Sequence, residues 1–260
     1  MKGLRQHPLR VTGRFFWFVG VVILATFDFL FQCVFHLKKP GLVERALWLH
    51  RSSRRTLQIF GLKPQVTGPV PSNGLLVSNH MSYLDILVLA TITPAVFVAK
   101  REVKYWPVIG WLAKLGGTLF IDRKRRTDVG QLTVEIQMAL KQGALVVLFP
   151  EGTSSNGQNV LPFKSALLEP ATQQTHPLAV GCIGYALEKG DVDEEVCYWR
   201  DMTFFPHMLN LLSKRGVQAS VRFAPFERSR TNRKELAQQL RSEVLRLKEG
   251  REEPNFTAGL

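Results

Sequence analysis

Short apolar runs alternate with stretches of helical periodicity along most of this chain. Five of the runs predict buried strands, at residues 74–77, 95–99, 119–121, 144–149 and 176–181. A strictly alternating run predicts a further strand at 217–223, and a short strand entering the core is expected at 62–67. Helical periodicity is most regular from 127 to 143, where Thr127 or Asp128 can cap the start and Gly143 the end.

Strands that alternate with helices predict an α/β fold. We expect a single mixed, largely parallel sheet flanked by helices, with functional residues at the strand ends. Further helices are predicted at 43–60, 108–115, 206–212 and 228–249, and the polar stretch at 188–195 predicts a loop.

The longest apolar run lies near the N-terminus, from 15 to 37, and basic residues flank it on both sides. As a helix, these 23 residues would be about 35 Å long, compared with about 30 Å for the hydrocarbon core of a bilayer. A single span, a helix in the interface and a re-entrant hairpin bent near Gly20 or Asp28 all fit this length. No small-residue cleavage site precedes a polar segment, so we expect an uncleaved membrane-associated helix or helical hairpin.

The net charge of +13 and the pI of about 10.0 predict an anionic partner surface. Nucleic acid and acidic lipid headgroups both fit this charge, but the sequence has no zinc-finger spacing and no RNA-binding aromatic signature. The apolar N-terminal run favours a membrane. The three cysteines are widely spaced, which suits a reducing compartment, and neither a metal site nor a cofactor is expected.

The stretch 78–85 places polar residues directly after a predicted strand and before a predicted helix. His80 is expected on the turn and Asp85 in the first turn of the helix, so the carboxylate can orient one imidazole nitrogen. The other nitrogen is then able to take a proton from a substrate hydroxyl. A structural alternative remains open, because Ser82 could cap the helix and Asp85 could complete a variant capping box.

Three motifs follow one another along the chain: Asn79-His80-x-x-x-x-Asp85, then Gly-Thr-Leu-Phe-Ile-Asp-Arg at 117–123, then Phe-Pro-Glu-Gly-Thr at 149–153. Their order and spacing resemble the glycerolipid acyltransferases, the family that includes 1-acylglycerol-3-phosphate acyltransferase. The resemblance extends from about 75 to about 181.

The resemblance implies that His80 is the general base and that Asp85 orients it. It also implies substrate-binding residues on both sides of this pair: Asn79, Lys100, Gly117, Thr118, Arg123, Glu151, Gly152, Thr153, Ser154 and Lys164. Arg123 is the expected headgroup clamp, since a guanidinium suits phosphate. Glu151 is expected to be held by the basic cluster or by a glycerol-like hydroxyl, and His176 is the second candidate for the catalytic histidine.

The sequence departs from the family pattern at Ser154, where many lysophosphatidate acyltransferases have arginine. The loss of that cation weakens the case for a bare phosphomonoester as the acceptor. The C-terminal part resembles a bacterial subgroup that acylates lyso-ornithine lipid, a zwitterionic acceptor without phosphate.

The resemblance therefore implies a membrane-bound enzyme that moves a fatty acyl group from acyl carrier protein or coenzyme A to the free hydroxyl of a lysolipid. The expected acceptor is of the 1-acylglycerol-3-phosphate class, giving phosphatidic acid, and lyso-ornithine lipid is the alternative. A non-catalytic, basic lipid-binding protein of the membrane surface is the alternative of another class, and sequence support for nucleic-acid binding is thin.

The expected organisation has three parts: a membrane anchor at 1–40, an acyltransferase domain at 41–227, and a charged C-terminal helix and tail at 228–260. The expected location is the cytoplasmic face of the inner membrane.

Overall fold

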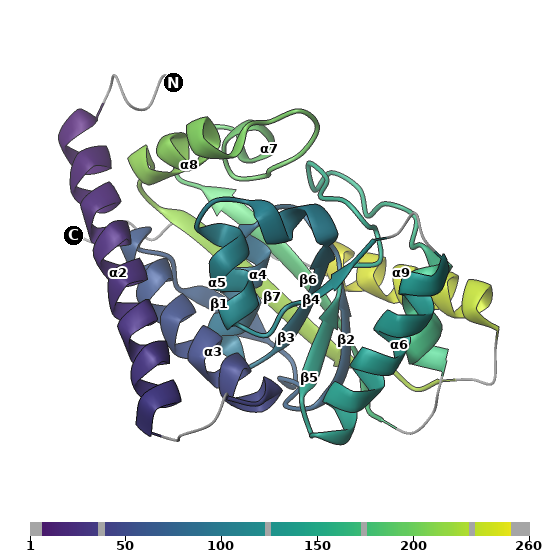
Figure 1. Cartoon of the computed structure of the whole chain (residues 1–260). Helices are drawn as coiled ribbons and strands as arrows, with labels where there is room; N and C mark the ends of the chain where they lie inside the picture. Colours follow the sequence, from purple (N-terminus) through teal and green to yellow (C-terminus); the bar gives the residue numbers. More distant parts are fainter. Residues whose placement is uncertain (1–6, 36–39, 123–125, 173–175, 229–231, 251–260) are drawn as a thin grey trace.

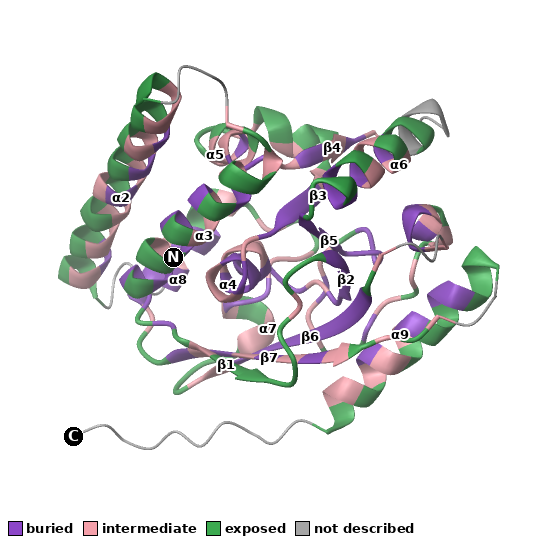
Figure 2. Ribbon diagram, turned by 90° about the horizontal axis from the view of Figure 1, so that it is seen from below, coloured by how far each residue is buried: buried purple, intermediate pink, exposed green. Residues whose placement is uncertain are grey.

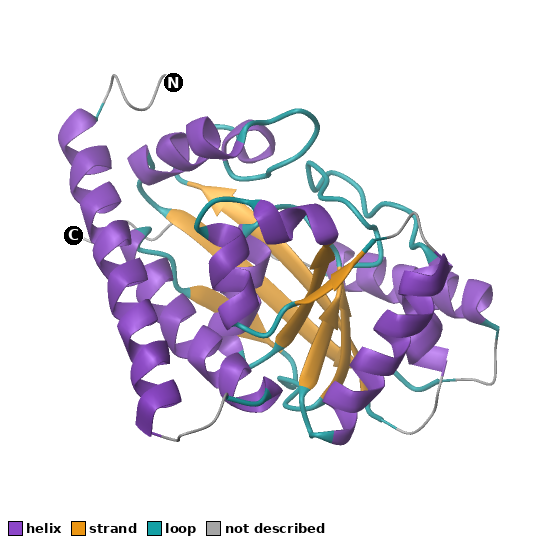
Figure 3. Cartoon of the chain, viewed as in Figure 1, coloured by secondary structure: helices purple, strands orange, loops and turns teal. Residues whose placement is uncertain are grey.

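A computed structural model describes residues 7–35, 40–122, 126–172, 176–228 and 232–250, with only the backbone described at 126–129. It contains a seven-stranded sheet in the order β1-β7-β6-β2-β5-β3-β4, surrounded by helices (Figures 1 and 3). The strands are β1 (Pro64–Thr67), β2 (Gly74–Ser78), β3 (Val96–Lys100), β4 (Leu119–Ile121), β5 (Leu145–Leu148), β6 (Leu178–Leu187) and β7 (Val217–Pro225).

All neighbouring strands are parallel except β6 and β7, which are antiparallel. The predicted mixed, largely parallel sheet is therefore confirmed. β2 and β5 are buried along their whole length, as expected for central parallel strands covered on both faces. The short strand expected at 62–67 meets the core only at its start. Leu62 is buried in the core, whereas three of the four residues of β1 are exposed, because β1 forms an edge of the sheet beside β7.

Helices cover both faces of the sheet (Figure 2). Each face has its own apolar cluster. One face packs against α3 (Leu42–Ile59), α4 (Leu84–Ile92) and α8 (Phe204–Ser213). The other packs against α6 (Arg126–Lys141), the 3-10 helix η2 (Ser165–Thr172) and α9 (Arg233–Glu249). Successive residues of β2 divide between the two clusters: Leu76 faces α4, and Leu75 and Val77 face α6 and α9.

The N-terminal apolar run forms one continuous helix, α2 (Pro8–Phe35), with no bend into a hairpin at Gly20 or Asp28. α2 packs against α3 and α8, and the Trp48 indole donates to the Ala25 carbonyl at 2.8 Å. Only 17% of its most apolar 18-residue window is buried, and it is long and apolar enough to cross a membrane. Its outer face is an exposed apolar surface, with Phe16 and Phe27 each about two-thirds exposed.

Three further differences from the expected elements have local causes. β6 continues to Leu187 instead of ending near residue 181, because β7 pairs with it over its whole length. The predicted polar loop contains one helical turn, α7 (Val192–Glu195), which the Asp191 carboxylate caps. α9 begins at Arg233, not at Arg228, because Asn232 accepts from the first free amides and starts the helix there.

The remaining elements are the 3-10 helix η1 (Arg101–Tyr105) and α5 (Ile109–Leu115), which follow β3. The start of α5 lines a cavity together with α2 and α8.

Candidate active site

The carboxyl ends of three parallel strands bring the predicted motifs together. Val77 of β2 pairs with Leu148 of β5 and with Val180 of β6, so the segments that follow β2 and β5 leave the sheet side by side. His80 lies on the first of these segments and Glu151 on the second. β3 ends at the same edge, which places Lys100 beside them.

His80 and Asp85 form a hydrogen-bonded pair across the corner between β2 and α4. The Nδ1 atom of His80 lies 2.7 Å from Asp85 Oδ2. Because an ionised carboxylate only accepts hydrogen bonds, Nδ1 carries the proton and Nε2 has the free lone pair. The His80 side chain is 21% exposed and lines a cavity, whereas Asp85 is completely buried.

The buried Asp85 carboxylate accepts from every donor around it. Besides His80, Oδ2 accepts from the backbone N–H of Met81 at 2.6 Å and of Ser82 at 3.0 Å. Oδ1 accepts from the Tyr185 hydroxyl at 2.6 Å. Burial, and then the nearby Asp85 charge, raise the pKa of Tyr185 well above its ordinary value, so the phenol stays protonated as a donor. These four donors hold the carboxylate and fix the orientation of the imidazole.

The capping alternative is correct for Asp85 and wrong for Ser82. Asp85 accepts from the Ser82 amide at the start of α4, as in a capping box, while it also holds His80. The Ser82 hydroxyl makes no cap and has no hydrogen-bond partner among the described residues. The N-cap residue is Tyr83, which has helical backbone angles.

The cavity at His80 has a volume of about 310 Å³. The imidazole stacks on the Phe149 ring, with centroids 4.3 Å apart and planes 17° from parallel. The other walls come from the start of α4, the end of β3, η1, α5, the segment after Glu151 and the segment before α8. They include Lys100, Val103, Trp106, Ile109, Gly152, Thr153, Ser154, Tyr198, Trp199 and Arg200.

A second, larger apolar cavity of about 770 Å³ lies between α2, the start of α5 and α8. Phe15, Phe18 and Phe204 are among its lining residues. It shares Trp106, Ile109 and Tyr198 with the cavity at His80. The two cavities are therefore adjacent, and apolar and aromatic side chains form their common wall.

Glu151 holds the backbone of the site and not a cationic side chain. Its Oε1 accepts from the His80 amide at 2.7 Å, and its Oε2 accepts from the Leu161 amide at 2.9 Å. The residue is 2% exposed, and burial raises the pKa of Glu151 to about 7, against the opposing effect of these two amides. The expected basic partner is replaced by backbone donors, which fix the position of His80.

Replacing Glu151 with glutamine is expected to destabilise the fold, because one acceptor oxygen becomes an NH₂ group that faces a backbone N–H. An unsatisfied buried donor costs about 1–3 kcal/mol. A pKa raised from 4.5 to about 7 adds stability below pH 4.5, and this contribution is lost as the pH rises through 7. Chemical denaturation should thus show that wild type exceeds Glu151→Gln in free energy of unfolding by more at pH 5 than at pH 8. A difference in free energy of unfolding that stays constant or grows with pH would contradict a raised pKa of Glu151 in the folded protein.

Asn79 and Ser154 also use their side chains on the backbone. The Asn79 amide pairs with both polar groups of Ile183 in β6, donating at 3.0 Å and accepting at 2.7 Å. The Ser154 hydroxyl donates to the Tyr198 carbonyl. These contacts fasten two neighbouring segments to the corner at His80, and Ser154 still lines the cavity.

The other predicted substrate-binding residues divide into two groups. Lys100, Gly152 and Thr153 line the cavity at His80. Gly117 and Thr118 lie at the amino end of β4, where Gly117 has a φ of +76° and packs near Arg45, away from the cavity.

Three predicted residues remain. The exposed Lys164 does not line the cavity, although its amide donates to the Pro150 carbonyl at 2.8 Å. Arg123 lies outside the described residues. His176 precedes β6, at the amino edge of the sheet and thus at the opposite end from His80.

Several residues of the site were missed by the sequence analysis. Tyr185 lies on the part of β6 beyond its predicted end. Phe149 was placed in a strand and in the third motif, but not in the wall of the site. Arg200 comes from an irregular segment that carries no periodicity, and its guanidinium carbon lies 3.8 Å from the centroid of the Trp199 ring. Arg200 has a φ of 53°, an unusual value for a residue other than glycine. Within the described residues, no cluster of three His, Cys, Asp or Glu side chains could hold a metal ion.

Several known proteins are similar to this chain. Residues 63–184 match the profile of the family described as Acyltransferase. A lyso-ornithine lipid O-acyltransferase from Brucella abortus is 32% identical over 251 residues, which are 90% of this chain and 93% of that protein. One from Rhizobium meliloti is 33% identical over 74% of each chain.

Two further relatives carry a different name. A 1-acyl-sn-glycerol-3-phosphate acyltransferase from Neisseria gonorrhoeae is 35% identical over 54% of this chain and 59% of its own. The crystal structure of a 1-acyl-sn-glycerophosphate acyltransferase from Thermotoga maritima superposes with a TM-score of 0.68 at 18% identity, over 97% of this chain and 100% of that chain. This likeness supports the fold.

Proposed function

Since the chain belongs to the Acyltransferase family, we propose that it moves a fatty acyl group from a thioester, acyl carrier protein or coenzyme A, to the free hydroxyl of a membrane lysolipid. One observation carries the proposal: His80, which is hydrogen-bonded to the buried Asp85, lines a cavity that adjoins the apolar cavity beside α2. In this proposal the hydrocarbon chain of the lysolipid lies in the apolar cavity beside α2, and its free hydroxyl, which is next to the headgroup, reaches His80. No metal or cofactor is needed.

His80 acts as the general base. Its Nε2 atom takes the proton of the acceptor hydroxyl, whose oxygen attacks the thioester carbonyl carbon. The carbon–sulfur bond then breaks, and the leaving thiolate takes the proton back from the imidazolium. The Asp85 carboxylate keeps Nδ1 protonated and stabilises the imidazolium, so the pair works as the histidine and aspartate of a catalytic triad do.

The backbone amides of Thr153 and Ser154 hold the oxyanion in this mechanism. Both residues line the cavity, and neither amide donates a hydrogen bond to another described residue. Preorganised backbone donors at the developing negative charge are worth about 10²–10³ in rate each. The turn at Gly152, with a φ of +76°, presents these two amides after Glu151 has fixed the start of the loop.

Lyso-ornithine lipid is the favoured acceptor, because the relatives named for it match this chain along up to 93% of their own length. Lysophosphatidate is the second candidate, favoured by the charges of the cavity: Lys100 and Arg200 line it, and no acidic side chain does. Both acceptors carry an anionic group. We propose that Arg200 binds this anionic group, because it supplies a guanidinium in a site where residue 154 is serine.

Replacing Arg200 with glycine separates binding from stability. Glycine adopts a positive φ without strain, so the free energy of unfolding should stay within about 1 kcal/mol of wild type. Loss of the guanidinium should lower kcat/KM for an anionic lysolipid by about 10- to 100-fold, the equivalent of one charge-assisted hydrogen bond. With the uncharged acceptor monoacylglycerol, the variant and the wild type should be equal. An equal loss for both acceptors would contradict the assignment.

An acceptor panel tests the proposed function. Purified protein in mixed micelles receives labelled acyl donor and, in separate reactions, lyso-ornithine lipid, lysophosphatidate or lysophosphatidylcholine, and the products are identified by mass. We expect the highest kcat/KM with lyso-ornithine lipid. Vesicle binding without acylation of any lysolipid would instead support a non-catalytic lipid-binding protein.

A further inference from the structure

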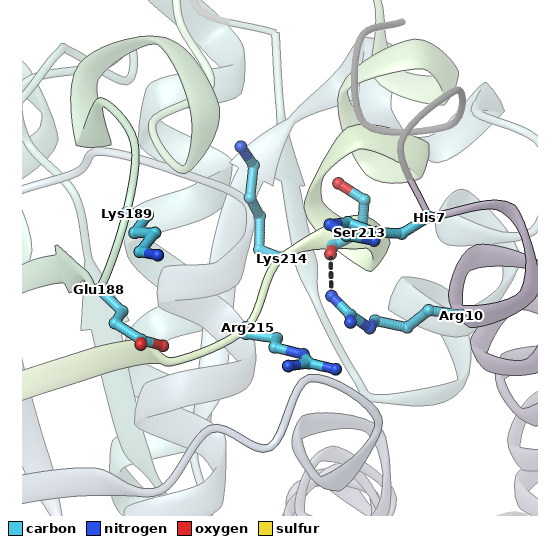
Figure 4. Close-up of a pocket in the computed structure, with 7 residues that line it drawn as sticks. All are labelled: His7, Arg10, Glu188, Lys189, Ser213, Lys214 and Arg215. Atoms are coloured by element: carbon cyan, nitrogen blue, oxygen red, sulfur yellow. Dashed lines mark hydrogen bonds between the residues drawn. The ribbon is translucent and has the colours of Figure 1, made fainter. Parts of the chain in front are cut away.

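A separate cavity of about 450 Å³ lies at the N-terminal end of α2 and shares no residue with the cavity at His80. Figure 4 shows three segments around it: the start of α2, the turn after β6, and the connection from α8 to β7. Its lining residues are His7, Arg10, Glu188, Lys189, Ser213, Lys214 and Arg215.

Two arginines of α2 build this cavity by bonding to the end of α8. Arg10 donates to the Ser213 carbonyl at 2.9 Å, and Arg14 donates to the carbonyls of Leu212 at 3.0 Å and Lys214 at 2.6 Å. Carbonyls at a helix C-terminus carry partial negative charge, so these contacts are favourable. The start of α2 therefore forms one wall of the cavity.

The cavity has more positive than negative charge. Lys214 is paired with Glu195, and Glu188 is the carboxylate among the lining residues. The four cations outnumber the two carboxylates by two positive charges. The cations are Arg10, Lys189, Lys214 and Arg215, and the carboxylates are Glu188 and Glu195. Lys189 and Arg215 make no hydrogen bond or ion pair with another described residue. Such an excess of cations in a concave site favours an anion, and guanidinium groups suit phosphate.

The position of the cavity indicates where that anion comes from. α2 leads away from the cavity with an exposed apolar face, on which Phe16 is 66% and Leu24 60% exposed. A ligand that fills the cavity with its charged group and covers this face with hydrocarbon is an anionic lipid. The arrangement matches that of basic residues next to a membrane-associated helix.

We propose that this cavity binds the phosphate of an anionic membrane phospholipid that is not the acyl acceptor. Lys189, Arg215 and the remaining donors of Arg10 contact the phosphate, and the lipid chains lie beside α2. The bound lipid holds α2 at the bilayer surface and against α8 at the same time. This proposal does not depend on the chemistry at His80.

Vesicle co-sedimentation of the full chain tests this proposal, with Lys189→Gln/Arg215→Gln as the variant. Neither side chain bonds to the described protein, so the melting temperature should not change. Binding to vesicles of phosphatidylcholine with phosphatidylglycerol should weaken about 30-fold, since each cation near an anionic surface contributes roughly fivefold. The exposed pair Lys141→Gln/Lys234→Gln, on α6 and α9, makes the same change in net charge and should bind as wild type does.

Two comparisons distinguish a specific phosphate site from non-specific attraction of a basic protein to an anionic membrane. Vesicles in which a fatty acid replaces phosphatidylglycerol at equal charge should bind the wild type more weakly, and the double variant should lose this preference. Equal binding of the wild type to both vesicles, or equal losses in the two double variants, would overturn the proposal. A cavity specific for free phosphate would also overturn it: inorganic phosphate would raise the melting temperature, while vesicle binding would be unaffected by Lys189→Gln/Arg215→Gln.

Discussion

Replacing His80 with alanine is expected to lower kcat by about 10²–10⁴-fold, the usual contribution of a positioned general base. The reason is geometric. Among the side chains that line the cavity, the His80 imidazole has its Nδ1 atom held by a buried carboxylate, which leaves Nε2 available as the base. Without it, the acceptor hydroxyl must lose its proton to water. KM for the lysolipid should change little, because the aromatic walls and the cations of the cavity remain. Initial rates at saturating donor measure the effect.

His176→Ala is the matched control, since it removes the other candidate histidine at the opposite edge of the sheet. This variant should retain turnover within about twofold. The His80 ring stacks on Phe149, so a melting curve must confirm that His80→Ala is folded. Turnover of folded His80→Ala within about tenfold of wild type would refute the assignment of the base.

Replacing Asp85 with asparagine is expected to lower kcat by about 10³–10⁴-fold and to destabilise the fold as well. In a catalytic triad the same substitution costs about 10⁴, because the imidazole is held in the wrong tautomer. Asparagine offers one acceptor oxygen where Asp85 receives four donors, so its NH₂ group must face a backbone N–H or the Tyr185 hydroxyl. One or two unsatisfied buried donors cost about 1–3 kcal/mol each.

Tyr185→Phe separates the two effects of Asp85→Asn. It removes one donor to Oδ1 and leaves the bond from Asp85 to His80 intact. We expect kcat within about tenfold of wild type and a loss of about 1–3 kcal/mol in the free energy of unfolding. If Tyr185→Phe were as inactive as Asp85→Asn, the carboxylate would act through the buried hydrogen-bond network and not through the orientation of His80.

The parts of the fold that follow from side-chain periodicity could be predicted from the sequence. The β2 and β5 strands are continuous apolar runs because both faces of the sheet are covered, and α6 shows its period because only one side of it is buried. The His–Asp pair could also be found, since five residues span a strand–turn–helix corner and bring the two side chains to 2.7 Å.

The contacts that complete the site have no such pattern. Glu151 accepts from two backbone amides, and backbone donors exist at every residue, so nothing in the sequence identifies these partners. Tyr185 reaches Asp85 because pairing with β7 extends β6, which is a property of the assembled sheet. Gly117 and Thr118 precede β4, whereas Ile121 at the end of β4 pairs with Lys100, so these two residues lie at the opposite end of the strand from the edge with Lys100.

A single-turnover experiment tests directly whether the acceptor hydroxyl, activated at His80, attacks the thioester without an acyl-enzyme. Excess protein is mixed with ¹³C-labelled acyl thioester and lysolipid, quenched at successive times, and both the lipid product and the intact protein are weighed by mass spectrometry. We expect that labelled diacyl product accumulates with wild type, that it is lost with His80→Ala, and that the protein mass never changes. A transient protein adduct with the mass of the acyl group, or the absence of labelled product with wild type, would contradict this expectation.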